Sequence, residues 1–426
     1  MSKKIRVAIA GVGSCASALV QGVQYYINHP DETIGLMFKE IGGYTADSYE
    51  FVCGFDVDAR KVGKRLNDAI YAKPNCNMQV IPPHSDLSCV ASTATVYRSP
   101  TLDGIAPHMR NFHPDITFVE ADDVEPITAE DYQAILKEHR VDVLLNYMPV
   151  GSTEAAKFHI ENAIKAGVHV VNCMPTYIST EAARGLERLA IQNKVTIVGS
   201  DMRSDYGASR LSEVLQGSLL DSGLLVTQHI QENKAAGTTQ GDTRRVGRSA
   251  NTDFLNMAVK DRLHDKHISK ENVLTGQSVV RGIDVAGTTQ YAGPSLTVLQ
   301  RPGGQYVGSD NKIANIDIVA FGWAGARYEL FARLSVQDSP NSAGIVFDAV
   351  RFCKVASEMD IRGYLRGPSA WSQKTPPVQM KTSDSKFECE ALARRELTNM
   401  TRKQVGDNID IDALEYTFQA GKTAYE

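Results

Sequence analysis

The sequence has no long apolar run, no close cysteine pair and no excess of positive charge, and each absence excludes a class of protein. Its apolar runs fall short of the roughly 18 residues that indicate a membrane-spanning helix, and the short run at 7–12 contains glycine, unlike the core of a signal peptide. The seven cysteines are odd in number and form no CxxC pair, which argues against a disulfide framework or a zinc site. A net charge of −5 argues against a general nucleic-acid surface. We therefore expect a cytoplasmic protein that binds neither membranes nor nucleic acids.

The first half of the chain alternates short apolar segments with amphipathic ones. Its 426 residues, 42% of them hydrophobic, are enough to build two domains. Strands are expected at 4–10, 50–58, 115–119, 141–147, 168–172 and 195–199, and helices at 16–27, 129–139, 153–166 and 180–193. This alternation predicts an α/β fold with a doubly wound parallel sheet of the Rossmann type. Residues 29–49 and 73–112 break the rhythm and are interpreted as loop insertions.

The pattern changes after residue 205. We expect a helix at 207–221, strands at 224–231, 276–285, 312–321 and 326–337, and a further helix at 343–359. This order predicts a second, α+β domain with an open mixed sheet. We therefore divide the chain into a Rossmann domain at 1–205 and a second domain at 206–342. The helices at 343–380 are expected to pack back on the first domain, and 381–426 forms a C-terminal extension.

Gly11, Gly13 and Ala16 form a dinucleotide fingerprint directly between the first strand and the first helix. Gly11 permits the tight turn, Gly13 lets the backbone approach a pyrophosphate, and Ala16 is small enough for the helix to pack closely on the strand. Together with Ser14 and Cys15, these residues place the pyrophosphate at the start of a helix, where exposed N–H groups favour an anion. The alternative is a purely structural glycine turn.

Asp56 ends the second strand, where an acidic residue binds the adenosine ribose and favours NAD over NADP. It lies farther from the fingerprint than the usual ~20 residues, which the insertion at 29–49 explains. Tyr147 and Pro149 follow a later strand, and ligands bind at the carboxyl ends of parallel strands, so we expect both to line the nicotinamide half of the site. The alternative is an ordinary strand-to-helix turn with Ser152 as its N-cap.

Two further polar segments precede helices. Ser204 and Gly207 lie where a helix starts, and the exposed N–H groups of that helix suit a phosphate. Residues 338–344 (DSPNSAG) form a polar turn before an apolar helix, and taken alone Asp338 or Ser342 is expected to be the N-cap of that helix.

Together these segments resemble the myo-inositol-1-phosphate synthases, particularly their shorter prokaryotic branch. The matching segments are 6–26, 51–70, 100–105, 141–152, 251–257, 265–270, 338–344 and 374–377. The most specific are RVAIAGVGSCASALVQGVQYY at 6–26, NTDFLNM at 251–257 and DSPNSAG at 338–344. Residues 381–426 lie outside the resemblance.

The resemblance implies an isomerase of inositol and phospholipid biosynthesis that converts glucose 6-phosphate to inositol 1-phosphate (1D-myo-inositol 3-phosphate) without net redox. Bound NAD oxidises C5 of the open-chain sugar, the C6 carbanion closes on the C1 aldehyde, and NADH reduces the ketone. Such a site needs a retained cofactor, cations for the phosphate and the developing oxyanions, and closure against water. The resemblance also implies a homotetramer built through the second domain, and a divalent or monovalent cation.

The functional positions of the family can be matched one by one. The resemblance implies that the catalytic residues are Lys266, Lys270, Lys312, Lys374, Asp201 and Asp253. It implies that the cofactor is contacted by Asp338, Asn341 and Ser342, and that the phosphate is contacted by Ser204, Gly207 and Lys270. Each lysine alone is typical of a solvated surface, but four at the family's positions indicate a functional set. One or two would neutralise phosphate, and one with a pKa lowered by cationic neighbours would shuttle a proton.

Two departures from the family pattern concern the substrate. The segment 234–250, with Arg244, Arg245 and Arg248, is longer than the loop of the family, and it is either a surface loop or a lid that orders over phosphate. Arg203 stands where the family usually has lysine, and arginine cannot donate a proton at ordinary pH. Another sugar phosphate, such as fructose 6-phosphate, is therefore an alternative substrate. A net dehydrogenase of the homoserine-dehydrogenase type and a silent NAD-binding regulatory homologue are alternative functions.

Overall fold

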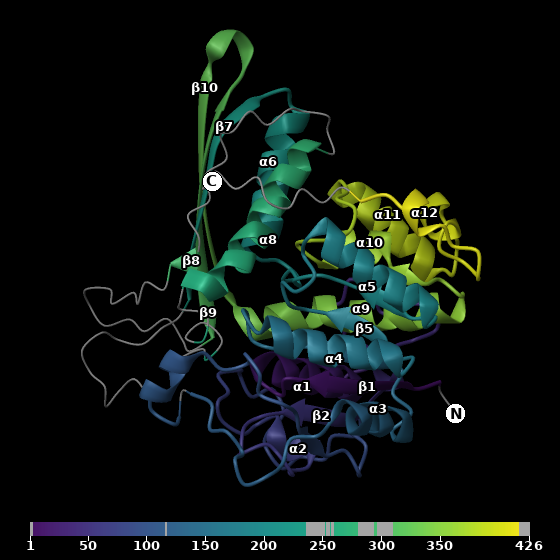
Figure 1. Ribbon diagram of the computed structural model, residues 1–426. Coiled ribbons are helices and arrows are strands. Elements are labelled where there is room, and N and C mark those ends of the chain that lie inside the picture. Colours follow the sequence, from purple (N-terminus) through teal and green to yellow (C-terminus); the bar gives the residue numbers. More distant parts are fainter. Residues whose placement is uncertain are drawn as a thin grey trace.

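A seven-stranded parallel sheet forms the centre of the first domain (Figure 1). The computed structural model describes residues 3–115, 117–235, 252, 256, 260–279, 294–295 and 310–416. Across the sheet the strands are β11 (Gly363–Tyr364), β6 (Thr196–Val198), β5 (His169–Asn172), β4 (Val143–Asn146), β1 (Ile5–Ala10), β2 (Tyr49–Asp56) and β3 (Val96–Arg98). All neighbouring pairs are parallel. This is the strand order of dinucleotide-binding sheets extended by β11, so the predicted fold class is confirmed.

Helices cover both faces of this sheet. On one face lie α1 (Ser14–Asn28) and α9 (Asp338–Glu358), and on the other lie α3 (Ala129–Glu138), α4 (Thr153–Lys165) and α5 (Thr180–Gln192). Successive side chains of a strand point to opposite faces, so Val7 and Ile9 of β1 join the core under α1 and α9, whereas Ala8 and Ala10 join the opposite core. The four helices predicted between residues 16 and 193 are confirmed.

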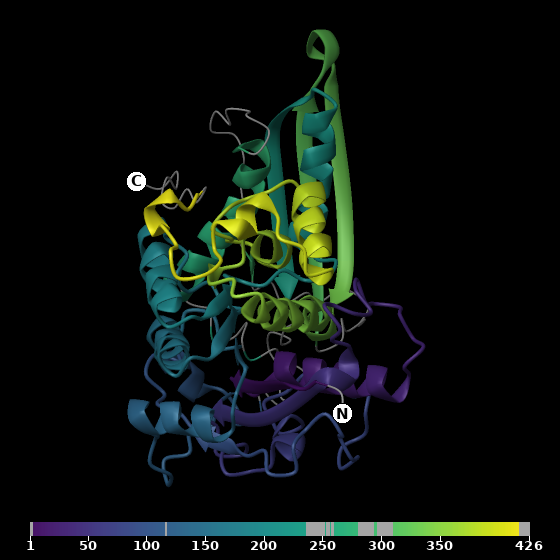
Figure 2. The same ribbon diagram turned by 90° about the vertical axis from the view of Figure 1, so that its right-hand side faces the viewer.

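The second sheet extends away from the first domain (Figures 1 and 2). Its strands, in order, are β10 (Arg327–Gln337), β9 (Asn311–Phe321), β7 (Leu225–Ala235) and β8 (Pro294–Ser295). β9 pairs antiparallel with β10 and β7, and β8 pairs parallel with β7, so this sheet is open and mixed as predicted. Helix α6 (Ala208–Asp221) packs on β7 and β9 and against α8 (Lys260–Val279). No loop separates β10 from α9, because Gln337 ends the strand and Asp338 begins the helix.

The C-terminal helices pack beside the first domain. α10 (Arg366–Ser372) contacts α9 and α11 (Thr382–Ala393), and α12 (Asn399–Arg402) follows (Figure 1). Cys389 and Leu392 of α11 are buried in the core that α1 and α9 share. Further helical elements among the described residues are α2 (Leu66–Ala69) and the 3-10 turns Ala46–Ser48, Pro107–Asn111, Trp323–Gly325 and Ile411–Ala413. In the part of the chain that the structure describes, no helix has the length and apolar character needed to cross a membrane.

The strand expected at 115–119 is wrong for its described residues. Residues 117–119 form no strand, although the N–H of Ala59 donates to the carbonyl of Val119 (2.7 Å). The edge of the sheet is taken instead by β3, which lies inside the segment 73–112 that we interpreted as a loop. The apolar pattern of a short segment does not reveal whether that segment, rather than another one, pairs with the edge of a sheet.

Two further predictions fail in the second half of the chain. The strand expected at 276–285 is helical over 276–279, where α8 ends, and 280–285 lie outside the described residues. α8 stays helical there because it packs on α6 and buries Val273 and Leu274. Residues 338–344 are not a turn but the beginning of α9.

Candidate active site

One cavity at the carboxyl ends of β1, β2, β4 and β6 gathers most of the predicted site residues. α8, the start of β9, the start of α9 and the segment after α10 form its other walls. The predicted residues that line it are Gly11, Gly13, Ser14, Cys15, Asp56, Tyr147, Pro149, Ser204, Gly207, Lys266, Lys270, Lys312, Asp338, Ser342 and Lys374. Ala16 is buried in the core behind the glycine loop. Asp253 and the segment 236–250, including its three arginines, lie outside the described residues.

The glycine loop has the shape that a dinucleotide requires. Gly11 has a φ of 89°, and a Cβ atom there would lie 2.6 Å from the carbonyl oxygen of Tyr147. Only glycine therefore fits at this position. Nothing lies within 4 Å of a Cβ built on Gly13, which lines the cavity. α1 starts at Ser14 with no capping side chain from Gly13, and a helix start of this kind suits an anion.

The carboxylate of Asp56 lies at the predicted place but also holds the glycine loop. Its Oδ2 accepts the N–H of Val12 (2.8 Å), and its Oδ1 accepts the N–H groups of Val57 (2.8 Å) and Asp58 (3.0 Å). The buried Lys61 lies 3.9 Å from Oδ2, and no sequence motif singles it out. Asp56 thus joins the second strand to the fingerprint, in addition to its predicted contact with ribose.

The start of α9 forms one wall of the cavity and corrects the expected N-cap. The N-cap position is Gln337, without a capping side-chain bond, and neither Asp338 nor Ser342 caps the helix. Asp310 does so instead, since its carboxylate accepts from the N–H (3.0 Å) and the hydroxyl (2.9 Å) of Ser339. Burial and the nearby charge of Asp338 raise the pKa of Asp310 to about 6.

Asn341, predicted to contact the cofactor, is bonded to a neighbouring loop. Its amide accepts the N–H of Tyr206 (3.0 Å) and donates to the carbonyl of the same residue (3.0 Å). The loop that Asn341 holds runs from Ser204 to Gly207, and α6 starts immediately after it without a capping side chain from Gly207. This uncapped helix start lines the cavity and can bind a phosphate.

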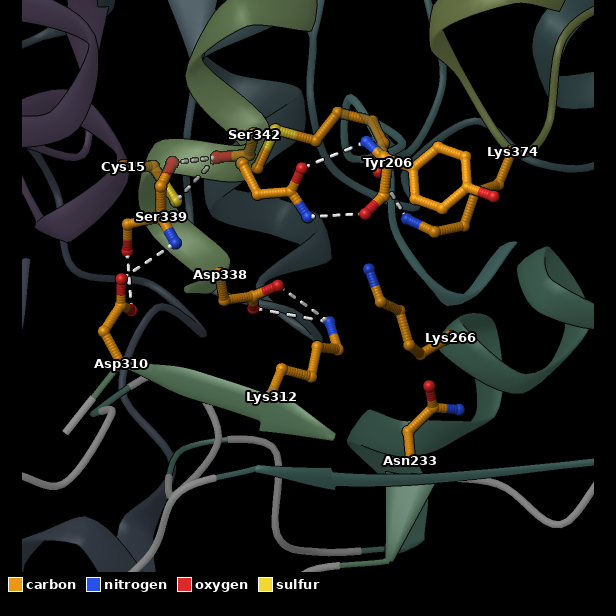
Figure 3. Close-up of polar contacts among 12 residues, drawn as sticks. Cys15, Tyr206, Asn233, Lys266, Asp310, Lys312, Asp338, Ser339, Ser342 and Lys374 are labelled. Atoms are coloured by element: carbon orange, nitrogen blue, oxygen red, sulfur yellow. Dashed lines mark hydrogen bonds and ion pairs between the residues drawn. The ribbon is translucent and has the colours of Figure 1, made fainter. Parts of the chain in front are cut away.

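The four predicted lysines converge on the cavity from three parts of the chain. Lys266 and Lys270 lie on α8, Lys312 lies on β9, and Lys374 follows α10. Figure 3 shows Lys266, Lys312 and Lys374 pointing toward a common space. Lys312 Nζ lies 3.1 Å from Asp338 Oδ1, so the first turn of α9 also carries a counter-charge for this set.

Asp201 is the buried counter-ion of Lys266 and Lys374. Its Oδ1 lies 2.6 Å from Lys266 Nζ and 3.1 Å from Lys374 Nζ, and its Oδ2 accepts from the hydroxyl of Ser269. Burial alone would raise the pKa of Asp201, but the two ammonium groups lower it below its ordinary value. Ser269 has a signal in the sequence that we missed, because it lies one turn after Lys266 on the same helix.

Burial lowers the pKa of two lysines of the cavity. It is the largest cause that lowers the pKa of Lys374 to about 7, with Asp201 opposing the change. Burial, together with the charges of the other three lysines, lowers the pKa of Lys270 well below its ordinary value. The cavity therefore combines cations with one amine, that of Lys374, that can accept and return a proton near neutral pH. Among the residues that the structure describes, no three His, Cys, Asp or Glu side chains gather as a metal site.

Comparison with known proteins identifies relatives along nearly the whole chain, although no protein-family model matches it. The inositol-3-phosphate synthase of Mycolicibacterium smegmatis is 37% identical over 396 residues, which cover 91% of this chain and 98% of that protein. The inositol-3-phosphate synthase of Mycobacterium tuberculosis is 37% identical over 383 residues, covering 89% and 93%. Among solved structures, Ari2 has a TM-score of 0.64 at 25% identity and covers 92% of this chain and 100% of its own. A myo-inositol-1-phosphate synthase-related protein from Thermotoga maritima shares the fold, with a TM-score of 0.70 at 20% identity over 93% and 100% of the two chains.

Proposed function

Because the chain belongs to the inositol-3-phosphate synthase family, we propose that it makes inositol phosphate by isomerising glucose 6-phosphate to 1D-myo-inositol 3-phosphate. The observation that carries this proposal is the set of four lysines that line one cavity with the glycine loop, three of which, Lys266, Lys374 and Lys312, are paired with Asp201 or Asp338. Such a set suits a phosphorylated substrate that develops negative charge on oxygen. A silent homologue would have little use for mutually repelling buried amines, which cost stability.

The residues present fit NAD as the cofactor. Gly11, Gly13 and the first turn of α1 would hold its pyrophosphate, and Asp56 would hold the adenosine ribose. Tyr147 and the start of α9 would border the nicotinamide. When bound, NAD supplies a hydride acceptor from which the hydride can later return, which suits an isomerisation without net redox.

The side chains of this protein would supply charge and proton transfer. The start of α6 and Ser204 would bind the phosphate. Lys266, held by Asp201, would stabilise developing negative oxygen. Lys270, with its lowered pKa, would accept the proton that C6 must lose, and Lys374 would return a proton to the C1 oxygen. Asp253, which matches an acidic position of the family, would also be a catalytic residue.

The proposal includes a cytoplasmic homotetramer. On the open face of the second sheet Phe331 is 71% exposed, and Phe321 and Leu225 are also exposed, which leaves an apolar surface for another copy of the chain. All seven cysteines are among the described residues and none of them forms a disulfide, as expected in a reducing compartment.

The proposal is tested by incubating the protein with glucose 6-phosphate and NAD. Phosphorus NMR follows the product while absorbance follows NADH, and we expect inositol phosphate with no net NADH. Stoichiometric NADH would show a net dehydrogenase instead. Turnover of fructose 6-phosphate but not of glucose 6-phosphate would show a cyclase for a different sugar.

A further inference from the structure

Asp201 and Lys374 lie on two short segments that pair through their backbones. Residues 200–203 and 372–375 form an antiparallel ladder, in which the N–H of Lys374 donates to the carbonyl of Asp201 (2.7 Å). At one end of this ladder, residues 200 and 375 exchange two hydrogen bonds of 3.0 and 3.1 Å. The position of the Lys374 ammonium on Asp201 therefore depends on how firmly the two segments are held together.

Arg203 holds the other end of the ladder together through both its backbone and its side chain. Its backbone N–H donates to the carbonyl of Ser372 (2.8 Å), and its Nε donates to the carbonyl of Gln373 (2.7 Å), the residue before Lys374. Its Nη1 donates to Glu213 on α6. Arg203 is only 1% exposed, so the guanidinium acts inside the protein. One side chain thus ties α6 to the backbone beside Lys374.

Glu213 is itself fixed by a residue of its own helix and by two other helices. It accepts from Arg210 Nη1 of α6 (3.3 Å), from Gln277 Nε2 of α8 (3.1 Å) and from Thr382 Oγ1 of α11 (2.9 Å). These contacts give Arg203 a rigid anchor. They also mean that Glu213 keeps a cationic partner when Arg203 is replaced, so that replacement does not leave a buried unpaired charge.

We propose that Arg203, anchored on Glu213, is a positioning residue that holds the segment 372–375 so that the Lys374 ammonium stays on Asp201. The inference rests on the proposed function, since it assigns a task to the residue that departs from the family pattern. The Lys374–Asp201 contact is 3.1 Å long, and a shift of about 1 Å would remove it as a hydrogen bond. A lysine at 203 could bond either Gln373 or Glu213 but lacks the fork needed for both.

The test compares Arg203→Met, Arg203→Lys and the control Arg6→Met. Arg6 makes matching contacts, with Nε on the carbonyl of His139 (2.8 Å) and Nη1 on Glu50, but lies at the other end of β1. We expect Arg203→Met to lower kcat about 10- to 100-fold with the Kd for NAD unchanged. Arg203→Lys should lower kcat less than Arg203→Met does. Arg6→Met should keep the kcat of the wild type. The inference would be overturned if Arg203→Met lost NAD binding to the same extent as it lost kcat. If Arg203→Met does not fold, the inference would be overturned by an Arg203→Lys variant that keeps the full wild-type kcat.

A second measurement separates this inference from the proposed function. The pKa of Lys374 is measured by competitive acylation across a pH series, read by peptide mass spectrometry, which needs no turnover. Arg203→Met should lower this pKa below that of the wild type, because Lys374 loses Asp201 and keeps the repelling charges of Lys266 and Lys312. An unchanged or raised pKa overturns the inference. If the wild type does not turn over glucose 6-phosphate, the proposed function fails while this titration still decides the role of Arg203.

Discussion

Replacing Lys374 by methionine should remove part of the rise in stability between pH 7 and pH 9. Burial, the largest cause, lowers the pKa of Lys374 to about 7, whereas an unfolded lysine titrates near 10.4. Between these values the unfolded chain binds a proton that the native chain lacks, so the free energy of unfolding rises by up to ~1.4 kcal/mol per pH unit. Since native Lys374 is half protonated at pH 7, its share of the rise from pH 7 to pH 9 is about 2 kcal/mol.

Urea unfolding at pH 7 and pH 9 measures this share. The control is Lys386→Met, which removes a lysine side chain that is 54% exposed and makes a surface pair with Glu390. The wild type and the control should show the same rise in the free energy of unfolding, and Lys374→Met should show a rise smaller by about 2 kcal/mol. An equal rise in all three proteins would refute the reasoning, because it would mean that Lys374 is protonated in the native state at pH 9.

The other predictions concern the cofactor, the chemistry and the start of α9. Lys270→Ala should abolish turnover and leave NAD binding intact, and near wild-type kcat would exclude its proton-transfer role. Gly11→Ala should weaken NAD binding by more than about 1 kcal/mol in calorimetry, because a side chain at φ 89° would meet the carbonyl of Tyr147 at 2.6 Å; an unchanged Kd would contradict this. Asp310→Ala should lower the free energy of unfolding by about 1 kcal/mol in urea titrations through loss of the cap on Ser339, and an unchanged value would show that α9 does not need it.

The features that could be predicted from the sequence are those in which neighbouring residues act together. The glycine fingerprint needs only a strand, a turn and a helix in succession, and Asp56 needs only its place at the end of the second strand. The parallel sheet followed from the same alternation, which predicted β1, β2, β4, β5 and β6 but neither β3 nor β11. β3 was missed because its place at the edge depends on which distant segment pairs with β2, and local periodicity carries no such information.

The site depended more on the resemblance and on the tertiary fold. The four lysines were matched by resemblance, but the pairing of three of them with Asp201 and Asp338 requires α8, β9 and the segment after α10 to meet at one place. The cap of α9 comes from Asp310, beyond the whole length of β9 and β10, so no local pattern could reveal it. From the sequence we interpreted the arginine at 203 as a change in the proton chemistry of the site. In the structure its guanidinium instead contacts Glu213 and the backbone carbonyl of Gln373.

The direct continuation of β10 into α9 has a mechanical consequence. Hinges between domains absorb their motion in a few loop residues, and no such residue separates Gln337 from Asp338 (Figure 2). The hairpin of β9 and β10 is therefore connected without a hinge to the start of α9, which carries Asp338 and Ser342 into the cavity. A displacement of the hairpin would therefore be transmitted directly to this wall of the cavity, because no loop residue lies between β10 and α9 to absorb it.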